Sequence, residues 1–221
     1  MIDLQRDGDV HVLRFDNGEN RFSPGFLDAV GKTLDEVEKA GSPGALVTVG
    51  TGRFYSNGLD LDWLNANRDE LKDYLGRVHA LFARLLTFPM PTVAAVNGHA
   101  FAGGAMLVLS HDLAVMRTDR GYFCLPEVDL GMRFSPGMSA LIQARLTPAA
   151  AHEAMITGRR YTAEEALAAG MVARTADEAG TLPAAVELAA SLAGKDGGVV
   201  GRIRADMYGP VLAALRGPAL G

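Results

Sequence analysis

The stretch "TVAAVNGHAFAGGAML", residues 92–107, decides the fold. Its start, "TVAAVNG", is a short run of small and β-branched residues that predicts a buried strand. The small residues "HAFAGG" predict a turn, and the apolar residues from about Gly103 to Ser110 predict a helix. A second stretch, "ALVTVGTGRFYSNGLDL" at residues 45–61, has the same order of buried strand, glycine-rich loop and polar continuation. Strands followed by helices in this order predict a mostly parallel sheet with helices packed around it.

The flanking sequence extends this pattern. A helix is predicted between Ser23, a suitable N-cap that is followed by proline, and Gly41, a suitable stop. Helical spacing of apolar residues predicts another helix over 69–88, and β-forming residues predict strands at 10–15, 112–118 and 121–127. Helices dominate from residue 136 onward. The sequence therefore predicts an α/β protein of one domain over 1–221, with a strand-and-helix core over 1–135 and a helical region over 136–221.

Composition limits the class of protein. Of the 221 residues, 48% are hydrophobic and 21% charged, which is typical of a folded globular chain. A net charge of −5 without a basic cluster argues against nucleic acid as a partner, and no apolar run is long enough to span a membrane. The single cysteine, Cys124, and the polar start "MIDLQRDGDV" favour a cytoplasmic protein. The histidines lack the spacing of a metal site, so no metal is expected.

The two matching stretches suggest a site for an anionic oxygen. The turn between a strand and a helix leaves backbone N–H groups without partners. If two such turns face each other, two N–H groups can converge on one oxygen and stabilise an enolate-like oxyanion. Glycines after strands are also common in plain αβ connections, so spacing alone leaves both interpretations open.

Five segments, two of them within the stretches above, carry a resemblance to a known family: "FYSNGLDL" (54–61), "PTVAAVNGHAFAGG" (91–104), "HDLAV" (111–115), "LPEVDLGM" (125–132) and "TGRRYTAEEALAAGMV" (157–172). In this order and at these separations they resemble the crotonase superfamily, the enoyl-CoA hydratase/isomerase family. The resemblance implies a spiral of ββα units and an acyl-CoA substrate, with coenzyme A as part of that substrate and no separate cofactor. It also implies a homotrimer or a dimer of trimers, and it assigns the oxyanion N–H groups to Leu59 and Gly103. Because the chain ends earlier than family members commonly do, no contact from its C-terminal helices to coenzyme A is assigned.

Side chains narrow the expected reaction. Hydratases of this family carry two glutamates, and their positions correspond here to Met106 and Glu127. A thioether cannot carry a proton. Moving a double bond from C3 to C2, however, needs only one carboxylate, which removes a proton from C2 and returns one to C4. The dienoyl-CoA isomerases use aspartates at positions that correspond to Met106 and Ser135, which disfavours that activity. The chain looks closest to the monofunctional Δ3,Δ2-enoyl-CoA isomerases, with Glu127 as the single proton carrier, its pKa raised by an apolar wall.

Other interpretations stay open. The chain could be another crotonase-type enzyme (a weak hydratase, a hydrolase or a decarboxylase) or an acyl-CoA binder without activity. Glu127 could be an exposed residue at a strand end, or be paired with an arginine, and Asp60 could be a helix cap rather than a site residue. The arginines Arg133, Arg159 and Arg160 could contact phosphates or form surface ion pairs. The residues expected to bind substrate are Ser56, Asn57, Gly58, Asp60, Phe101, Gly104, Met106, Leu130 and Phe134.

Overall fold

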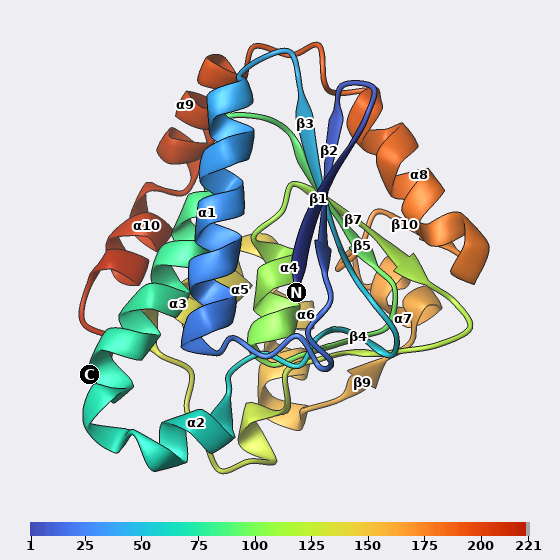
Figure 1. Cartoon of the computed structure of the whole chain (residues 1–221). Helices are drawn as coiled ribbons and strands as arrows, with labels where there is room; N and C mark the ends of the chain where they lie inside the picture. Colours follow the sequence, from blue (N-terminus) through green and yellow to red (C-terminus); the bar gives the residue numbers. More distant parts are fainter. Residues whose placement is uncertain (220–221) are drawn as a thin grey trace.

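The structure, a computed structural model, describes residues 1–219 (Figure 1). Its strands are β1 (Ile2–Asp7), β2 (Val10–Phe15), β3 (Ala45–Gly50), β4 (Phe54–Ser56), β5 (Thr92–Val96), β6 (His99–Phe101), β7 (Leu113–Arg117), β8 (Phe123–Cys124), β9 (Arg160–Tyr161) and β10 (Arg174–Ala176). Its α-helices are α1 (Pro24–Ala40), α2 (Leu61–Ala66), α3 (Leu71–Leu86), α4 (Gly103–Leu109), α5 (Pro136–Arg145), α6 (Pro148–Thr157), α7 (Ala163–Ala168), α8 (Glu178–Ala190), α9 (Gly197–Met207) and α10 (Gly209–Arg216).

The strands form two sheets. The larger sheet has the order β1-β2-β3-β5-β7-β10 and is parallel except for the β1–β2 hairpin. The smaller sheet has the order β4-β6-β8-β9 and is parallel except for β8–β9. The predicted β–α–β pattern is therefore confirmed, and β3 and β5 from the two matching stretches are direct neighbours.

The larger sheet is covered on both faces (Figure 1). Helix α8 packs against β3, β5 and β7 on one face, over a core of valine, alanine and leucine side chains. Helices α1, α3 and α4 lie on the other face over the main core. Strands buried on both faces need to be apolar throughout, and all residues of β3 and of β5 are buried.

Helix α1 shows how local signals set the predicted bounds. Ser23 accepts a hydrogen bond from the Phe26 N–H at the start of the helix, Pro24 occupies its first turn, and Gly41 with a positive φ ends it. The apolar residues at helical spacing face the core, and those that are buried are Phe26, Leu27, Val30, Leu34 and Val37. The predicted helix in 69–88 is found as α3.

Several elements were not predicted, and one predicted strand is shorter in the structure. The polar N-terminus forms β1, an edge strand whose side chains are mostly exposed, and its apolar alternation is limited to Ile2 and Leu4, which pack against the core. The predicted strand over 121–127 is reduced to Phe123–Cys124, because Pro126 begins a short 3₁₀ turn over Pro126–Val128. The glycine-rich turns contain the three-residue strands β4 and β6, and the predicted helical region contributes β9 and β10 to the two sheets.

None of the helices within residues 1–219 has both the length and the apolar character needed to cross a bilayer.

Candidate functional site

The two glycine-rich turns meet backbone to backbone. A Cβ atom placed on Gly58, which has φ 76°, would lie 2.6 Å from the backbone nitrogen of Gly103. A Cβ on Gly104 would lie 2.1 Å from the carbonyl oxygen of Ser56. Side chains cannot occupy these positions without moving the backbone, so glycine is required for the turns after β4 and β6 to touch.

The N–H groups of Leu59 and Gly103 lie where these turns meet, and neither has an acceptor within residues 1–219. By contrast, the N–H groups on both sides of Leu59 have acceptors. The Gly58 N–H donates to Ser56 Oγ at 3.1 Å, and the Asp60 N–H donates to the Tyr74 hydroxyl at 2.9 Å. Both Leu59 and Gly103 line the same cavity. A ligand oxygen in that cavity could therefore accept hydrogen bonds that the protein does not use.

The turn before Gly103 is strained. Ala102 has φ 51°, a conformation that residues with a side chain rarely adopt. Its N–H donates to the carbonyl of Cys124 on β8 at 3.0 Å, which fixes the peptide chain immediately before the free N–H. Strain of this kind persists where the surrounding structure holds it and is common at functional sites.

The cavity has a volume of about 830 Å³ and a mostly apolar lining. Helices α2 and α3 contribute Leu61, Leu64, Leu71 and Leu75, and α5 contributes Met138. Met106, which is 1% exposed, lines the cavity from α4. The leucines of α2 and α3 were not predicted as site residues, although the helical spacing of Leu71 and Leu75 was the signal that placed them on one face.

Glu127 brings a carboxyl group into this apolar surrounding. It lies in the 3₁₀ turn after β8, is 6% exposed, and its Oε2 has no hydrogen-bond partner in the described part of the chain. Burial raises the pKa of Glu127 to about 7, opposed by its own backbone N–H. Glu127 is therefore not exposed, and it forms no ion pair with an arginine within residues 1–219, so the interpretation as an exposed or arginine-paired residue is wrong. A carboxyl with this pKa can accept and release a proton near neutral pH.

The cavity lining includes one other carboxylate among the described residues. Asp62 has a side chain that is 86% exposed and pairs with Arg21 at 2.6 Å. Glu127 is therefore the group in this cavity that is suited to proton transfer.

The remaining predicted substrate-binding residues divide into two sets. Asn57, Phe101, Leu130 and Phe134 line the cavity together with Met106, although Leu130 is 52% exposed. The other four support the turns and are not part of the lining, namely Ser56, Gly58, Asp60 and Gly104.

Two members of the second set have clear structural roles. Ser56 is fully buried, and its Oγ donates to the carbonyl of Asn20 at 2.7 Å. Asp60 is the N-cap of α2 and accepts from the Trp63 N–H at 3.2 Å, which confirms its interpretation as a cap.

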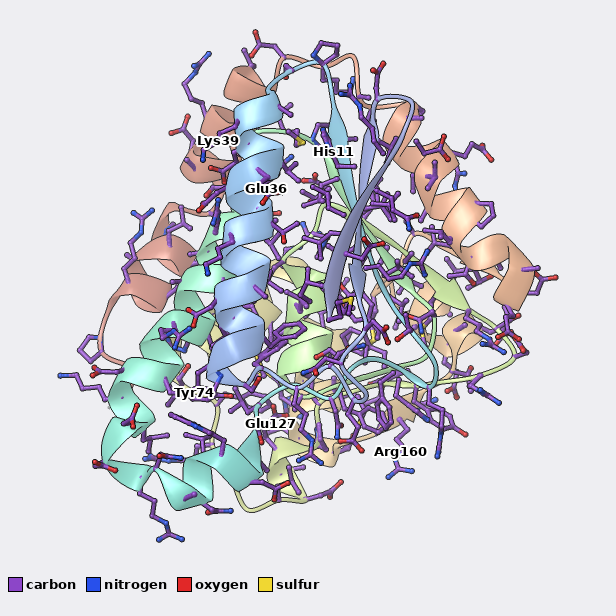
Figure 2. All side chains as sticks on the ribbon, viewed as in Figure 1. His11, Glu36, Lys39, Tyr74, Glu127 and Arg160 are labelled. Atoms are coloured by element: carbon purple, nitrogen blue, oxygen red, sulfur yellow. The ribbon has the colours of Figure 1, made fainter. Side chains whose placement is uncertain are left out.

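The three predicted arginines also differ. Arg159 forms ion pairs with Glu153 and Glu165 at 2.9 Å and 2.6 Å, as the surface interpretation predicts. Arg133 and Arg160 line the cavity and have no ion-pair partner within residues 1–219. Arg160 lies over the Phe101 ring, with 5.7 Å from its guanidinium carbon to the ring centroid. Figure 2 shows Tyr74, Glu127 and Arg160 at one end of the molecule and His11 at the opposite end.

No group of three or more His, Cys, Asp or Glu side chains within the described residues is arranged to hold a metal ion. The histidines are dispersed through the fold. His111, for example, is buried against Thr48, and burial lowers its pKa to about 4.

Comparison with known proteins identifies the family. Residues 5–221 match the enoyl-CoA hydratase/isomerase family. The chain is 37% identical to peroxisomal enoyl-CoA delta isomerase 2 of Arabidopsis thaliana over 98% of its own length and 95% of that protein. The fold superposes on the apo structure of an enoyl-CoA isomerase from Mycobacterium tuberculosis with a TM-score of 0.90, at 29% identity, covering 97% of this chain and 94% of that one.

A further structure of the same mycobacterial protein, described as a probable enoyl-CoA hydratase, has a TM-score of 0.91 at 28% identity and covers 97% of this chain and 91% of that one. The structural likeness therefore identifies the fold and the family rather than one reaction. The chain belongs to the enoyl-CoA hydratase/isomerase family, within the crotonase superfamily.

Proposed function

We propose that the protein is an enoyl-CoA Δ3,Δ2-isomerase, which moves a double bond in an acyl-CoA thioester from C3 to C2. The observation that supports this most strongly is Glu127, the one buried carboxyl group among residues 1–219, in an apolar cavity that is also lined by Leu59 and Gly103 with their unused N–H donors. The similarity to an enoyl-CoA delta isomerase over nearly the whole chain points in the same direction.

In the proposed reaction the thioester oxygen accepts hydrogen bonds from the N–H groups of Leu59 and Gly103. Glu127 removes a proton from C2, and the electrons move onto that oxygen to give a dienolate. The two N–H groups stabilise the negative charge, an interaction of about 3–4 kcal/mol per donor in well-formed oxyanion holes. Protonated Glu127 then returns the proton to C4, which leaves the double bond between C2 and C3.

Met106 accounts for the preference for isomerisation over hydration. Hydration requires one group that activates water and a second that protonates carbon. Met106 is buried in the lining where the second glutamate of the hydratases is expected, and a thioether can do neither. An apolar residue there also disfavours a water molecule beside the dienolate.

Assembly and compartment remain predictions. The family resemblance favours a homotrimer or a dimer of trimers, which light scattering of the purified protein tests. The composition favours the cytoplasm, whereas the Arabidopsis relative is named as a peroxisomal protein.

The direct test of the reaction uses 3-hexenoyl-CoA as substrate. We expect a conjugated 2-enoyl thioester of unchanged mass, and a loss of about 10²–10⁴-fold in kcat for Glu127→Gln, since a positioned proton carrier contributes that much. The matched control is Glu164→Gln, because Glu164 is an exposed glutamate of α7 outside the cavity lining.

Three outcomes would contradict the proposal. A product heavier by one water indicates hydration, and release of free coenzyme A indicates hydrolysis. Tight binding of acyl-CoA without turnover, unaffected by Glu127→Gln, indicates a binding protein without activity.

A further inference from the structure

Besides Glu127, a hydrogen-bonded pair of polar side chains, His79 and Ser135, lies beside the apolar part of the cavity, and the proposed reaction does not use it. Leu71 and Leu75 line the cavity from α3, and His79 follows one turn later on the same helix face. The ring of His79 is fully buried, and its Nε2 lies 2.8 Å from Oγ of Ser135. Ser135 is part of the cavity lining. The two residues form a hydrogen-bonded pair at the end of the leucine face of α3.

Packing alone does not account for this pair. An imidazole in an apolar core costs free energy unless it is hydrogen-bonded, and the preceding positions on this helix face are aliphatic. Helix capping does not account for it either. Ser135 caps α5 by accepting from the Met138 N–H at 3.2 Å. Thr147 caps α6 in the same way, accepting from the Ala150 N–H at 3.3 Å, and within residues 1–219 it has no hydrogen bond to a histidine.

Counting donors and acceptors shows what the pair still lacks. Burial lowers the pKa of His79 more than the nearby Leu215 carbonyl raises it, so the ring is neutral near pH 7 and has one N–H and one acceptor nitrogen. The Ser135 hydroxyl has one donor and two acceptor sites, and the Met138 N–H occupies one acceptor. If Ser135 donates to Nε2 of His79, one acceptor site of Ser135 stays open, and if Nε2 donates to Ser135, the Ser135 O–H stays open. In either tautomer Nδ1 of His79 is buried and has no hydrogen-bond partner within residues 1–219, but His79 is not part of the cavity lining, so Ser135 is the member of the pair that faces a ligand.

The missing partner can be identified from this count. Within residues 1–219 the Ser135 hydroxyl has no partner besides His79 and Met138. A hydroxyl group can donate to the open acceptor or accept from the open O–H, so it fits both tautomers of His79. A carbonyl oxygen fits only one of them, and a hydrocarbon chain fits neither.

We propose that the Ser135–His79 pair is a binding subsite for a hydroxyl group on the acyl chain, so that the preferred ligands are hydroxyacyl-CoA thioesters. This inference rests on the proposed function only in taking an acyl-CoA thioester as the ligand of the cavity. It does not depend on the reaction at Glu127.

The test measures binding of ligands that cannot be isomerised. The probes are octanoyl-CoA and its isomers with a hydroxyl group at C5, C6 or C7, titrated calorimetrically into the full-length protein. We expect at least one hydroxylated isomer to bind about five- to tenfold more tightly than octanoyl-CoA, the gain of one neutral hydrogen bond. Ser135→Ala and Ser135→Gly should both remove this difference and leave octanoyl-CoA binding within about twofold.

Two variants keep the result interpretable. Glycine is nearly as good an N-cap as serine, so Ser135→Gly removes the hydroxyl with little loss of stability. Thr147→Ala removes an equivalent cap on α6, outside the cavity lining, and should leave the preference for the hydroxylated ligand unchanged.

Equal binding of all four ligands to the natural protein would overturn the inference, because a water molecule would then satisfy the pair. A preference that survives in both Ser135 variants would also overturn it. Failure of the isomerase proposal has a different signature: 3-hexenoyl-CoA is not converted, while the hydroxyl preference and its dependence on Ser135 remain.

Discussion

At the scale of single residues, the burial of Glu127 lowers the stability of the fold and suits the carboxyl group to the proton transfer that we propose. Burial disfavours the ionised form of this carboxyl group, which is 6% exposed and has one oxygen without a partner within residues 1–219. The same desolvation that raises its pKa to about 7 makes it a base matched to neutral pH. Its cost should therefore be measurable as a pH-dependent loss of stability.

We predict that Glu127→Gln is stabilising at neutral pH and that the gain depends on pH. The pKa of Glu127 is raised from 4.5 to about 7 on folding, so the folded state holds the proton more tightly than the unfolded state. The contribution of Glu127 to the free energy of unfolding is therefore fully present below about pH 4.5. It is lost as the pH rises to about 7, by up to about 3 kcal/mol. Urea unfolding at pH 5 and pH 8 should show the variant gaining relative to the natural protein only at the higher pH. A constant difference would contradict the raised pKa.

Met106 allows a test of the apolar wall. Met106→Leu keeps the volume and the apolar character, so we expect kcat for 3-hexenoyl-CoA within about threefold of the natural protein. Met106→Gln adds a polar amide of similar length and should lower kcat by about tenfold or more, since it brings water close to the dienolate. Equal activity of both variants would show that an apolar residue is not needed there.

At the scale of elements, the site depends on two strand-to-helix turns that touch through glycine. The turn after β4 presents Leu59, and the turn after β6 presents Gly103. Because the backbones are in direct contact, a small displacement of α4 changes the distance between the two N–H groups. In the reaction that we propose, such a change should affect the transition state more than the binding of substrate.

We predict that Gly104→Ala lowers kcat for 3-hexenoyl-CoA by about 10²-fold with a smaller change in KM, since its Cβ would lie 2.1 Å from the Ser56 carbonyl oxygen and push α4 outward. Gly76→Ala is the matched control. Gly76 is exposed within α3, and no atom lies within 4 Å of a Cβ placed there. That substitution should stabilise the protein by about 0.5–1 kcal/mol without changing kcat. Normal turnover by Gly104→Ala would contradict the role given to the contact between the turns.

The sequence predicted the elements that carry strong local signals. Helix α1 has a cap, a proline in its first turn and a terminal glycine, and the buried strands β3 and β5 are apolar throughout. Strand β1 was missed because an edge strand exposes most of its side chains. The strands β4 and β6 have only three residues each, too few to show a period, and depend on pairing with each other.

The candidate site could be predicted only in part. The motifs placed Glu127, Leu59 and Gly103 at one cavity, but periodicity could not show that Ser56 and Gly104 lie behind the lining. The Ser135–His79 contact joins residues 56 positions apart, a pairing that only the folded chain reveals. Local patterns report local structure, whereas a cavity is made from distant segments.

At the scale of the whole molecule, the C-terminal helices α9 and α10 are held against the core by packing and by hydrogen bonds. Helix α10 packs on α3 and α5, and the N–H of Gly197 at the start of α9 donates to Oγ of Ser42, just after α1, at 3.2 Å. Arg204 on α9 is 6% exposed and donates to the carbonyl oxygens of Phe88 and Met90, and it pairs with Asp112 at 2.8 Å. This one side chain connects α9 to the segment between α3 and β5 and to the start of β7.

We predict that Arg204→Ala destabilises the fold by about 2–4 kcal/mol, because it leaves buried carbonyl groups and a partly buried carboxylate without their partner. The control is Arg202→Ala, since Arg202 is exposed on the same helix. If the chain is one domain, as the sequence predicts, fluorescence of the single tryptophan, Trp63, and far-ultraviolet circular dichroism should give coincident urea transitions for both variants. Separate transitions would instead indicate that 1–135 and 136–221 unfold independently.

The proposed reaction depends on one buried carboxyl group, that of Glu127, which carries the proton from C2 to C4. It is tested most directly with 3-hexenoyl-CoA bearing deuterium at C2, converted in ordinary water, with the product analysed by mass spectrometry and NMR. Because Glu127 is shielded from solvent, we predict that a substantial part of the deuterium removed from C2 is recovered at C4. Complete loss of that deuterium to water, with C4 protonated from solvent at every turnover, would contradict the account.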